Sequence, residues 1–218
     1  MNKIQQMFKL QKELNDATNG EIWTEGATKE KRIISWHRCI YMEAAEAIDS
    51  FNWKHWKDIE AEHDWENARV ELVDIWHFIM SEGIHIGDTK YPEVFLEIIP
   101  EKEPNGDKLI EILERLLAAS AQSCVDHEHN HYHEVVNHFF AAIKEIGMSV
   151  DGLYNRYLIK NQLNKFRQDH GYKEGSYLKH WEGMEDNIVA INIMNENPNL
   201  TPEELYKTLA KKYSKLSS

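Results

Sequence analysis

The chain has 218 residues, of which 37 are acidic and 25 are basic, so its net charge is −12. A chain of this length can bury a sizeable core unaided, and a hydrophobic content of 42% excludes disorder by composition. Wrapping a nucleic-acid backbone requires basic stripes, for which an acidic chain is a poor candidate. We therefore expect no nucleic-acid partner, but cations, or anions that are reached through cations.

The cysteine count and the N-terminal segment indicate the compartment. Two cysteines, Cys39 and Cys124, cannot form a disulfide framework and fit a reducing environment. Residues 1–20 contain no continuous apolar run, so no secretory signal is expected, and no stretch approaches the ~20 apolar residues of a membrane span. We expect a soluble, cytoplasmic protein with no membrane partner.

Helix breakers are sparse, with ten glycines and five prolines in the chain. They cluster at 19–26, 83–92, 100–106, 171–175 and 195–202. These clusters divide the chain into segments of helical length, and the sequence contains no alternating strand run flanked by hairpin turns. The pattern predicts an all-α fold of roughly seven to nine helices in a single domain over residues 1–218.

The helical segments can be followed along the chain. Apolar residues recur at spacings of three and four over 4–14 and again over 109–117, which is the period of a helix. The last helix is expected to start at Thr201, because this N-cap hydroxyl is followed by Pro202 at the first helical position and by Glu204 at N3.

Two segments, 40–49 and 70–79, are apolar nearly all round and carry one narrow polar stripe each. The stripe residues are Glu43, Glu46 and Asp49 in the first segment and Glu71, Asp74 and His77 in the second. A helix of this kind is covered by protein on all but one side. Carboxylates that are three residues apart lie about 4.5 Å apart along the helix axis, on the same face.

The paired carboxylates predict a metal site between facing helices. Each stripe could simply face water, but like charges at this spacing repel, and burying isolated carboxylates is costly. The repulsion and the cost of burial are both offset if the helices face each other and divalent cations lie between them. Oxygen ligands suit a hard ion, Mg²⁺ or Mn²⁺, which binds phosphate oxygens readily, so the stripes indicate metal-assisted phosphate chemistry.

A histidine-rich stretch spans residues 127–138. His127 and His131, His129 and His133, and Glu134 and His138 each have the i, i+4 spacing of helical metal ligands. Two interpretations stay open, a solvated and pH-sensitive helix face or an accessory transition-metal site.

The segment 160–177 concentrates basic and aromatic residues around a glycine turn. Arg167 can bind a phosphate with its fork, Lys160 and Lys173 can act as point charges, and Tyr172 can donate a hydrogen bond. Gly171 is expected to close a helix in the left-handed conformation, and the loop that follows to bind anions.

Several motifs in order resemble the dimeric, all-α dUTPases, most closely those of the Campylobacter type, within the all-α nucleoside triphosphate pyrophosphatases. The runs Glu43-Ala44-Ala45-Glu46 and Glu71-Leu72-Val73-Asp74 resemble the ExxE and ExxD metal motifs of that superfamily. The segments 10–16, 34–43, 49–57 and 160–177 narrow the resemblance to dUTPases. It covers roughly residues 1–82 and 150–195 and weakens over about 83–149, where the family carries a variable, more mobile helical portion.

The resemblance implies hydrolysis of dUTP, and of dUDP, to dUMP with release of pyrophosphate or phosphate, by a homodimer. This reaction limits uracil incorporation into DNA and supplies dUMP. The resemblance implies two or three Mg²⁺ ions, with Mn²⁺ as a substitute, on Glu43, Glu46, Glu71 and Asp74. Glu43 matches the carboxylate that orients and deprotonates the attacking water.

The resemblance also implies the residues that hold the substrate. Lys160, Arg167, Tyr172 and Lys173 match positions expected to bind the phosphates, and Gln11, Asn15, Trp53 and Asn161 match the nucleoside pocket. Amides can read a uracil edge or a sugar hydroxyl, and an aromatic ring can pack on the base. From the residues alone, Trp53 could equally belong to the core, and Gln11 could lie on a plain surface.

Two other functions stay open. One is a broad-specificity house-cleaning pyrophosphatase of the same superfamily, which would hydrolyse several nucleotides equally. The other is a non-catalytic helical interaction protein whose acidic stripes only bind cations.

Overall fold

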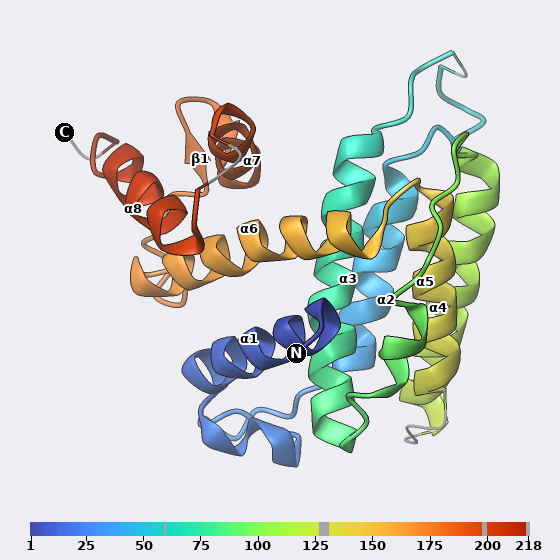
Figure 1. Ribbon diagram of the computed structural model, residues 1–218, viewed down its shortest axis with the longest axis horizontal. Helices are drawn as coiled ribbons and strands as arrows, with labels where there is room; N and C mark the ends of the chain where they lie inside the picture. Colours follow the sequence, from blue (N-terminus) through green and yellow to red (C-terminus); the bar gives the residue numbers. More distant parts are fainter. Residues whose placement is uncertain (59, 127–130, 198–199, 217–218) are drawn as a thin grey trace. The chain divides into compact units, whose positions relative to one another are not determined.

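The computed structural model describes residues 1–58, 60–126, 131–197 and 200–216 and confirms the all-α prediction (Figure 1). Eight α-helices lie within these residues: α1 (Lys3–Asn19), α2 (Trp36–Asp49), α3 (Trp65–Ile86), α4 (Gly106–Asp126), α5 (Tyr132–Glu145), α6 (Val150–Asp169), α7 (Asp186–Glu196) and α8 (Pro202–Tyr213). Two short 3₁₀ helices, η1 (Glu21–Glu25) and η2 (Tyr91–Phe95), and two two-residue strands, β1 (His180–Trp181) and β2 (Met184–Glu185), complete the order.

The chain forms two compact units, Met1–Tyr154 and Asn155–Ser218. The boundary falls within α6, whose first turn belongs to the first unit. A single domain over 1–218, with a core at about 1–82 and 150–218 and a variable portion at about 83–149, stays a prediction.

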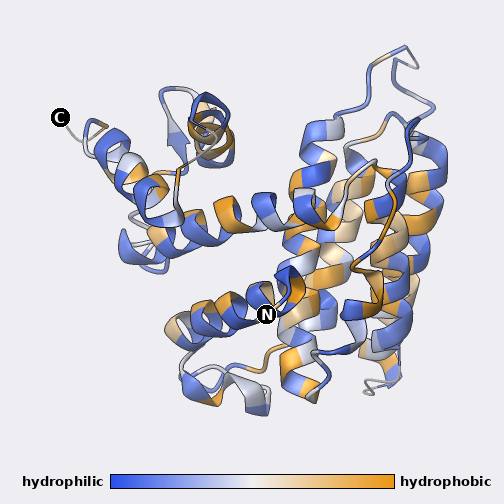
Figure 2. Ribbon diagram, in the orientation of Figure 1, coloured by the Kyte–Doolittle hydropathy of each residue, from blue (hydrophilic) through white to orange (hydrophobic). Residues whose placement is uncertain are grey.

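The first unit is a helical bundle in which α3 packs against α1, α2 and α5, and α4 packs against α2 and α5 (Figure 1). Ile75, Trp76 and Ile79 of α3 are fully buried, as its apolar sequence predicts. The Trp76 ring stacks on Phe139 of α5 with 5.1 Å between ring centroids and meets Phe8 of α1 edge-on at 5.9 Å. Figure 2 shows hydrophobic residues running along these bundle helices between hydrophilic faces.

The junction between α2 and α3 fixes how the two acidic stripes meet. Asp64 caps α3 by accepting a hydrogen bond from the Asn67 amide (2.9 Å), and its own amide donates to the Ser50 carbonyl at the end of α2 (2.8 Å). The Asn67 side chain also donates to the Ser50 hydroxyl (2.9 Å). The end of α2 is therefore tied to the start of α3, so the two helices run antiparallel side by side.

The glycine cluster at 83–92 ends a helix, as the sequence predicted, and the helix ends before Gly87 rather than at Gly83. α3 continues through Gly83 and ends at Ile86, with Gly87 left-handed at φ 77° as its cap. Gly83 is small for a packing reason: a Cβ at this position would lie 3.0 Å from the Asp88 carbonyl and from Tyr132 Cζ, and nearer still to the Tyr132 hydroxyl. The lack of space for a side chain, and not a turn of the backbone, therefore explains why residue 83 is a glycine.

We expect Gly83→Ala to destabilise the first unit by about 1–3 kcal/mol, because the added methyl overpacks a buried contact. Chemical denaturation of the variant measures the loss. Adding Tyr132→Phe to this variant removes the Tyr132 hydroxyl, which is the closest atom, and should restore part of the lost stability. The Asp88 carbonyl stays in place, so the restoration is expected to be incomplete. Full stability in Gly83→Ala alone would contradict this account of the contact.

The second unit has its own core, formed by the end of α6, the strand pair, α7 and α8. Its buried residues are Leu163, Phe166, Trp181, Val189, Ala190, Ile193, Leu205 and Leu209. The predicted start of α8 is confirmed, because Thr201 and Glu204 form a capping box with Pro202 in the first turn. The predicted left-handed glycine after α6 is confirmed as well, at Gly171 with φ 85°.

A short hairpin in the second unit was not predicted. β1 and β2 pair antiparallel, with Trp181 opposite Met184, and Glu182 and Gly183 between them both have positive φ (51° and 87°). This geometry is typical of a tight two-residue hairpin turn. Strands of two residues are too short to produce an alternating pattern in the sequence.

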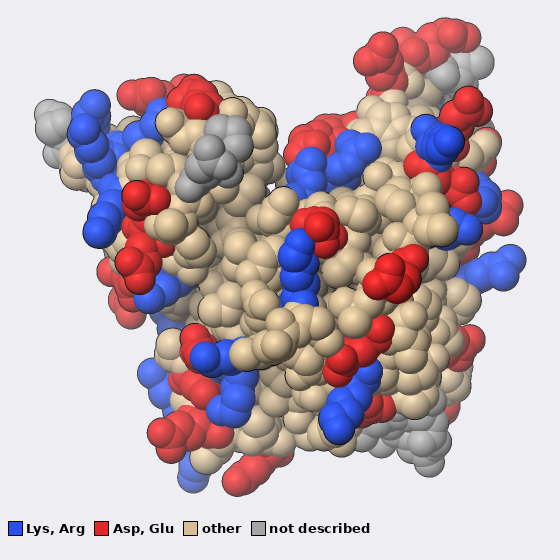
Figure 3. Space-filling view, in the orientation of Figure 1, with Lys and Arg blue, Asp and Glu red and all other residues tan. Residues whose placement is uncertain are grey.

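The surface of the helices carries both signs of charge. Figure 3 shows acidic and basic side chains interspersed over the visible face, and several form exposed ion pairs, such as Lys12 with Asp16 (2.7 Å) and Lys144 with Glu101 (3.2 Å). Among the described helices, none combines the length and the apolar content needed to cross a membrane.

Candidate active site

Three of the four predicted metal ligands converge between α2 and α3. Glu43, Glu46 and Glu71 each offer a carboxylate oxygen, and these oxygens lie within 4.8 Å of one another. Asp74 lies one turn after Glu71, and its charge also raises the pKa of Glu43. The antiparallel junction produces this arrangement, because it places the polar stripe of α2 beside the polar stripe of α3.

Glu43 is the most perturbed of these carboxylates. Burial raises the pKa of Glu43 to about 8, and the charges of Asp74, Glu71 and Glu46 add to this effect, as does a hydrogen bond with Glu71. Burial and like charges both disfavour the ionised form. A cation at this position would relieve the repulsion and bring the pKa of Glu43 down.

The donor set fits a hard divalent cation. All the converging groups are carboxylates, and hard cations such as Mg²⁺ take oxygen ligands and retain water. The nearby thiol of Cys39, one turn before Glu43, is not suited to ligation, because burial first and the charge of Glu43 second raise its pKa to about 11. Among the described residues, these carboxylates therefore favour a hard ion over a soft one.

Two predicted nucleoside residues, Gln11 and Asn15 of α1, are buried in the first unit at 3% and 5% exposure. Gln11 Nε2 donates to Asn15 Oδ1 (3.1 Å), and both amide groups donate to the Ser81 hydroxyl of α3, at 3.2 and 2.8 Å. His77 Nδ1 lies 2.6 Å from Gln11 Oε1. Gln11 is thus not a plain surface residue, and the structure brings the two amides together.

Trp53 lies in the loop between α2 and α3 and is 44% exposed, so it is not a core residue. Its ring meets Trp56 edge-on at 5.6 Å between centroids, and the Lys54 ammonium lies 5.4 Å from its ring centroid. Lys54 in turn pairs with Asp49 at the end of α2. An exposed ring that is held in this way can serve as an aromatic wall for a ligand.

Lys160 and Asn161 lie in the second unit on α6, and both are buried. Lys160 Nζ donates to Asn187 Oδ1 (3.1 Å), and Asn161 Nδ2 donates to the Tyr157 hydroxyl (3.1 Å). Both side chains therefore have fixed orientations on one stretch of helix.

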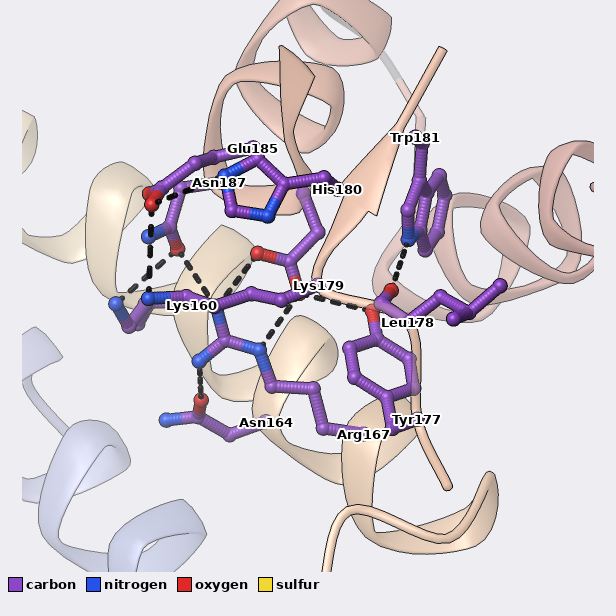
Figure 4. A network of polar contacts seen from close by, with 11 residues as sticks. Lys160, Asn164, Arg167, Tyr177, Leu178, Lys179, His180, Trp181, Glu185 and Asn187 are labelled. Atoms are coloured by element: carbon purple, nitrogen blue, oxygen red, sulfur yellow. Dashed lines mark hydrogen bonds and ion pairs between the residues drawn. The ribbon is translucent and has the colours of Figure 1, made fainter. Parts of the chain in front are cut away.

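Arg167 is the centre of a buried network in the second unit (Figure 4). Its Nε and Nη2 donate to the two carboxylate oxygens of Asp186, each at 2.7 Å, and Nη1 donates to Asn164 Oδ1 (3.2 Å). The Tyr177 hydroxyl donates to the same carboxylate (2.8 Å). Burial alone would raise the pKa of Asp186, but the hydrogen bonds and charge of Arg167 outweigh it and lower the pKa.

The last two predicted phosphate ligands follow Gly171. Tyr172 is 46% exposed, with its ring 5.7 Å from the Arg167 guanidinium, and Lys173 is exposed. The Tyr172 amide donates to the Arg167 carbonyl (3.0 Å), which anchors the turn to the helix end. Within the second unit, the structure therefore gathers Arg167, Tyr172 and Lys173 at one helix terminus.

The described histidines of the 127–138 stretch pair with carboxylates, while His127 and His129 lie outside the described residues. His131 contacts Glu134 (3.2 Å) and Asp126 (3.5 Å), and the hydrogen bond to Glu134 raises its pKa. His133 pairs with Asp88 (2.6 Å). Within the described part of the chain, these histidines do not join a group with metal-ligand geometry.

Comparison with known proteins decides the family. The family model described as dUTPase matches residues 3–172, which include both acidic helices and all of α6. The chain belongs to the dimeric, all-α dUTPase family. A search of curated proteins found no match. Membership of the dUTPase family assigns dUTP diphosphatase activity to the chain and indicates a divalent metal requirement, whereas α7 and α8 lie beyond the match.

The polar stripe of α3 in this dUTPase also carries residues that contact the two predicted nucleoside amides of α1. His77 is the third polar residue of the α3 stripe, after Glu71 and Asp74, and Ser81 follows it one turn later. Both contact the amides of α1. The stripe thus carries carboxylates at one end and an amide-binding pair at the other.

Proposed function

We propose that the protein hydrolyses dUTP to dUMP and pyrophosphate, and dUDP to dUMP and phosphate, as a Mg²⁺-dependent homodimer. The observation that carries the metal requirement is the convergence of Glu43, Glu46 and Glu71 on facing helices in a chain of the dUTPase family. Such an enzyme limits uracil incorporation into DNA and supplies dUMP, and we place it in the cytoplasm.

The carboxylates Glu43, Glu46, Glu71 and Asp74 would hold two or three Mg²⁺ ions, for which Mn²⁺ could substitute. When bound, the ions neutralise phosphate charge, polarise the phosphorus and lower the pKa of water. Glu43 orients the attacking water and takes its proton, a role that its position among the other carboxylates supports.

The remaining predicted residues hold the substrate. Lys160, Tyr172 and Lys173 would contact the phosphates, and Arg167 would do so through Nη1, since Nε and Nη2 are bound to Asp186. Gln11, Asn15, Trp53 and Asn161 would each contact the nucleoside. The exposed ring of Trp53 supports packing on the base, and the buried amides of Gln11 and Asn15 support reading of its edge.

The test is a nucleotide panel with Mg²⁺ present and then chelated. We expect dUTP to be hydrolysed with release of pyrophosphate, at a rate that clearly exceeds those for dTTP, dCTP and UTP, and activity to vanish on chelation and return with Mg²⁺ or Mn²⁺. Equal turnover of several nucleotides would instead indicate a broad-specificity pyrophosphatase. A protein without activity towards any of them would indicate a helical cation-binding protein.

A further inference from the structure

Asp186 is the one buried carboxylate among the acidic residues described in the second unit, with 0% exposure. It opens α7 and lies beyond residues 3–172, the part of the chain that the dUTPase family model matches. A carboxylate in such a position is costly to bury, and a buried ion pair adds little net stability over a well-packed apolar pair. Stability alone therefore does not explain why this residue is charged.

The hydrogen bonds of the Arg167 guanidinium can be counted. A guanidinium has five N–H groups, one on Nε and two on each Nη. Asp186 accepts one from Nε and one from Nη2, each at 2.7 Å. The second hydrogen of Nη2 lies towards Asn187 Oδ1 (3.4 Å), and Nη1 donates one hydrogen to Asn164 Oδ1 (3.2 Å; Figure 4). Within the described residues, a single Nη1–H is left for a ligand.

These contacts decide how Arg167 can meet a phosphate. A bidentate contact needs two parallel N–H groups, either from Nε and Nη2 or from Nη1 and Nη2. Both hydrogens of Nη2 are engaged, so neither edge is free. The geometry favours one N–H contact from Nη1, in place of the fork that the sequence suggested.

The direction of this Nη1–H depends on Asp186. The Tyr177 hydroxyl donates to Asp186 Oδ2 (2.8 Å), and the Asp186 amide donates to the Lys179 carbonyl (2.9 Å), so the side chain and the backbone of Asp186 are both fixed. An arginine side chain has several rotatable bonds. A guanidinium that is held before the ligand arrives therefore loses less conformational freedom on binding.

We propose that Asp186 is a positioning residue for phosphate recognition, which holds Arg167 at Nε and Nη2 so that its Nη1–H faces the substrate phosphates. This inference rests on the proposed phosphate role of Arg167. Asp186 itself does not contact the substrate, because its oxygens accept from Arg167 and Tyr177 and its charge repels a phosphate. The carboxylate thus has two opposed effects: its charge weakens phosphate binding, and its hold on Arg167 strengthens it.

The two effects predict opposite results for Asp186→Asn. The amide is uncharged, and its NH₂ group would meet a guanidinium N–H, donor against donor, so the guanidinium is released. We expect kcat/KM for dUTP with Mg²⁺ present to fall roughly 10- to 100-fold, mainly through a higher KM, because orientation outweighs repulsion. An unchanged or higher kcat/KM would overturn the proposal. Glu185→Gln changes the preceding, half-exposed carboxylate and should leave kcat/KM within about two-fold of wild type.

A second background separates positioning from folding. In Arg167→Lys there is no guanidinium to orient, so adding Asp186→Asn should lower kcat/KM by less than about two-fold further. All proteins are assayed at a temperature at which circular dichroism shows them folded. A merely structural role would lower kcat/KM by the same factor in both backgrounds, which would overturn the proposal.

Tyr177→Phe provides the test if Asp186→Asn does not fold. This variant removes one hydrogen bond to Asp186 and leaves the contacts between Asp186 and Arg167 in place. Its kcat/KM should fall roughly 2- to 5-fold in the wild-type background and stay unchanged in the Arg167→Lys background. An equal loss in both backgrounds would overturn the proposal.

Failure of the proposed function gives a different result. A wild type that does not hydrolyse dUTP would contradict the proposed function, and this outcome is separate from equal losses in the two backgrounds. Full kcat/KM in Arg167→Lys, with dUTP hydrolysis intact, would overturn the phosphate role of Arg167 and this proposal with it.

Discussion

Replacing Glu43 with Gln is expected to lower kcat for dUTP by roughly 10³- to 10⁴-fold and, at the same time, to raise the thermal stability of the metal-free protein. Activity falls because an amide cannot take a proton from water and is a weak ligand for Mg²⁺. Stability rises because Glu43 is half-buried among three other carboxylates, whose charges, together with burial, raise its pKa to about 8.

The stability difference should depend on pH in a defined direction. The folded-state pKa of Glu43, about 8, is above the value of about 4.5 for an unperturbed glutamate. Metal-free wild type therefore loses stability as pH rises from about 4.5 to about 8, where the folded state must give up this proton. The stability of Glu43→Gln should not fall over this pH range. Thermal unfolding of both proteins with a chelator at pH 5, 7 and 9 measures the difference.

Asp49 provides the matched control for Glu43. It lies on the same stripe of α2, but it is exposed and pairs with Lys54, and the carboxylates that converge with Glu43 do not include it. Asp49→Asn should leave kcat within a few-fold of wild type and leave the pH dependence of stability unchanged. Equal losses of activity in Asp49→Asn and Glu43→Gln would contradict the assignment of Glu43.

Replacing Asp186 with Asn is expected to destabilise the second unit by about 3–5 kcal/mol, because it leaves the buried guanidinium of Arg167 without its countercharge. Arg167 and Asp186 are 8% and 0% exposed, so water cannot substitute for the lost carboxylate. Hydrogen exchange of the α7 and α8 amides measures this loss, with chemical denaturation followed by Trp181 fluorescence as a second readout.

The same pair predicts an acid limit for the second unit. Arg167 holds the pKa of Asp186 below the 3.8 of an unperturbed aspartate, so the pair contributes stability above that pH and loses it as the pH falls through the lowered pKa. Glu185→Gln is the control. Glu185 is about half exposed and forms a surface ion pair with Lys179 at 3.7 Å. A surface pair of this kind contributes less than about 1 kcal/mol to stability. Equal destabilisation by both variants would contradict a special role for Asp186.

The parts of the fold that could be predicted are those that local sequence determines. The all-round apolar character of 70–79 predicted a buried helix with one polar stripe, and the capping residues after Thr201 predicted the start of α8. The grouping of Glu43, Glu46 and Glu71 also followed from spacing, because helical periodicity puts the carboxylates of each stripe on one face and the two stripes face each other.

What the sequence could not show depends on which residues meet across the chain. Arg167 was expected to bind phosphate, and nothing local indicated that Asp186, nineteen residues later, would bind its guanidinium on both Nε and Nη2. Gln11 was predicted to hold the nucleoside, with a plain surface position as the alternative, and nothing local indicated that His77 and Ser81 of α3 would contact its amide. In each case the sequence identified the polar residue, but tertiary packing determined which residue binds it.

The most direct test of the account is Mn²⁺ binding, followed by electron paramagnetic resonance in the presence of a dUTP analogue that cannot be hydrolysed. The account predicts saturable Mn²⁺ binding to the wild type and to Asp49→Asn, and binding about 10-fold weaker or more in Glu46→Gln and in Asp74→Asn. Unchanged Mn²⁺ affinity in Glu46→Gln and Asp74→Asn, with both proteins folded, would contradict the claim that these stripes hold the metal.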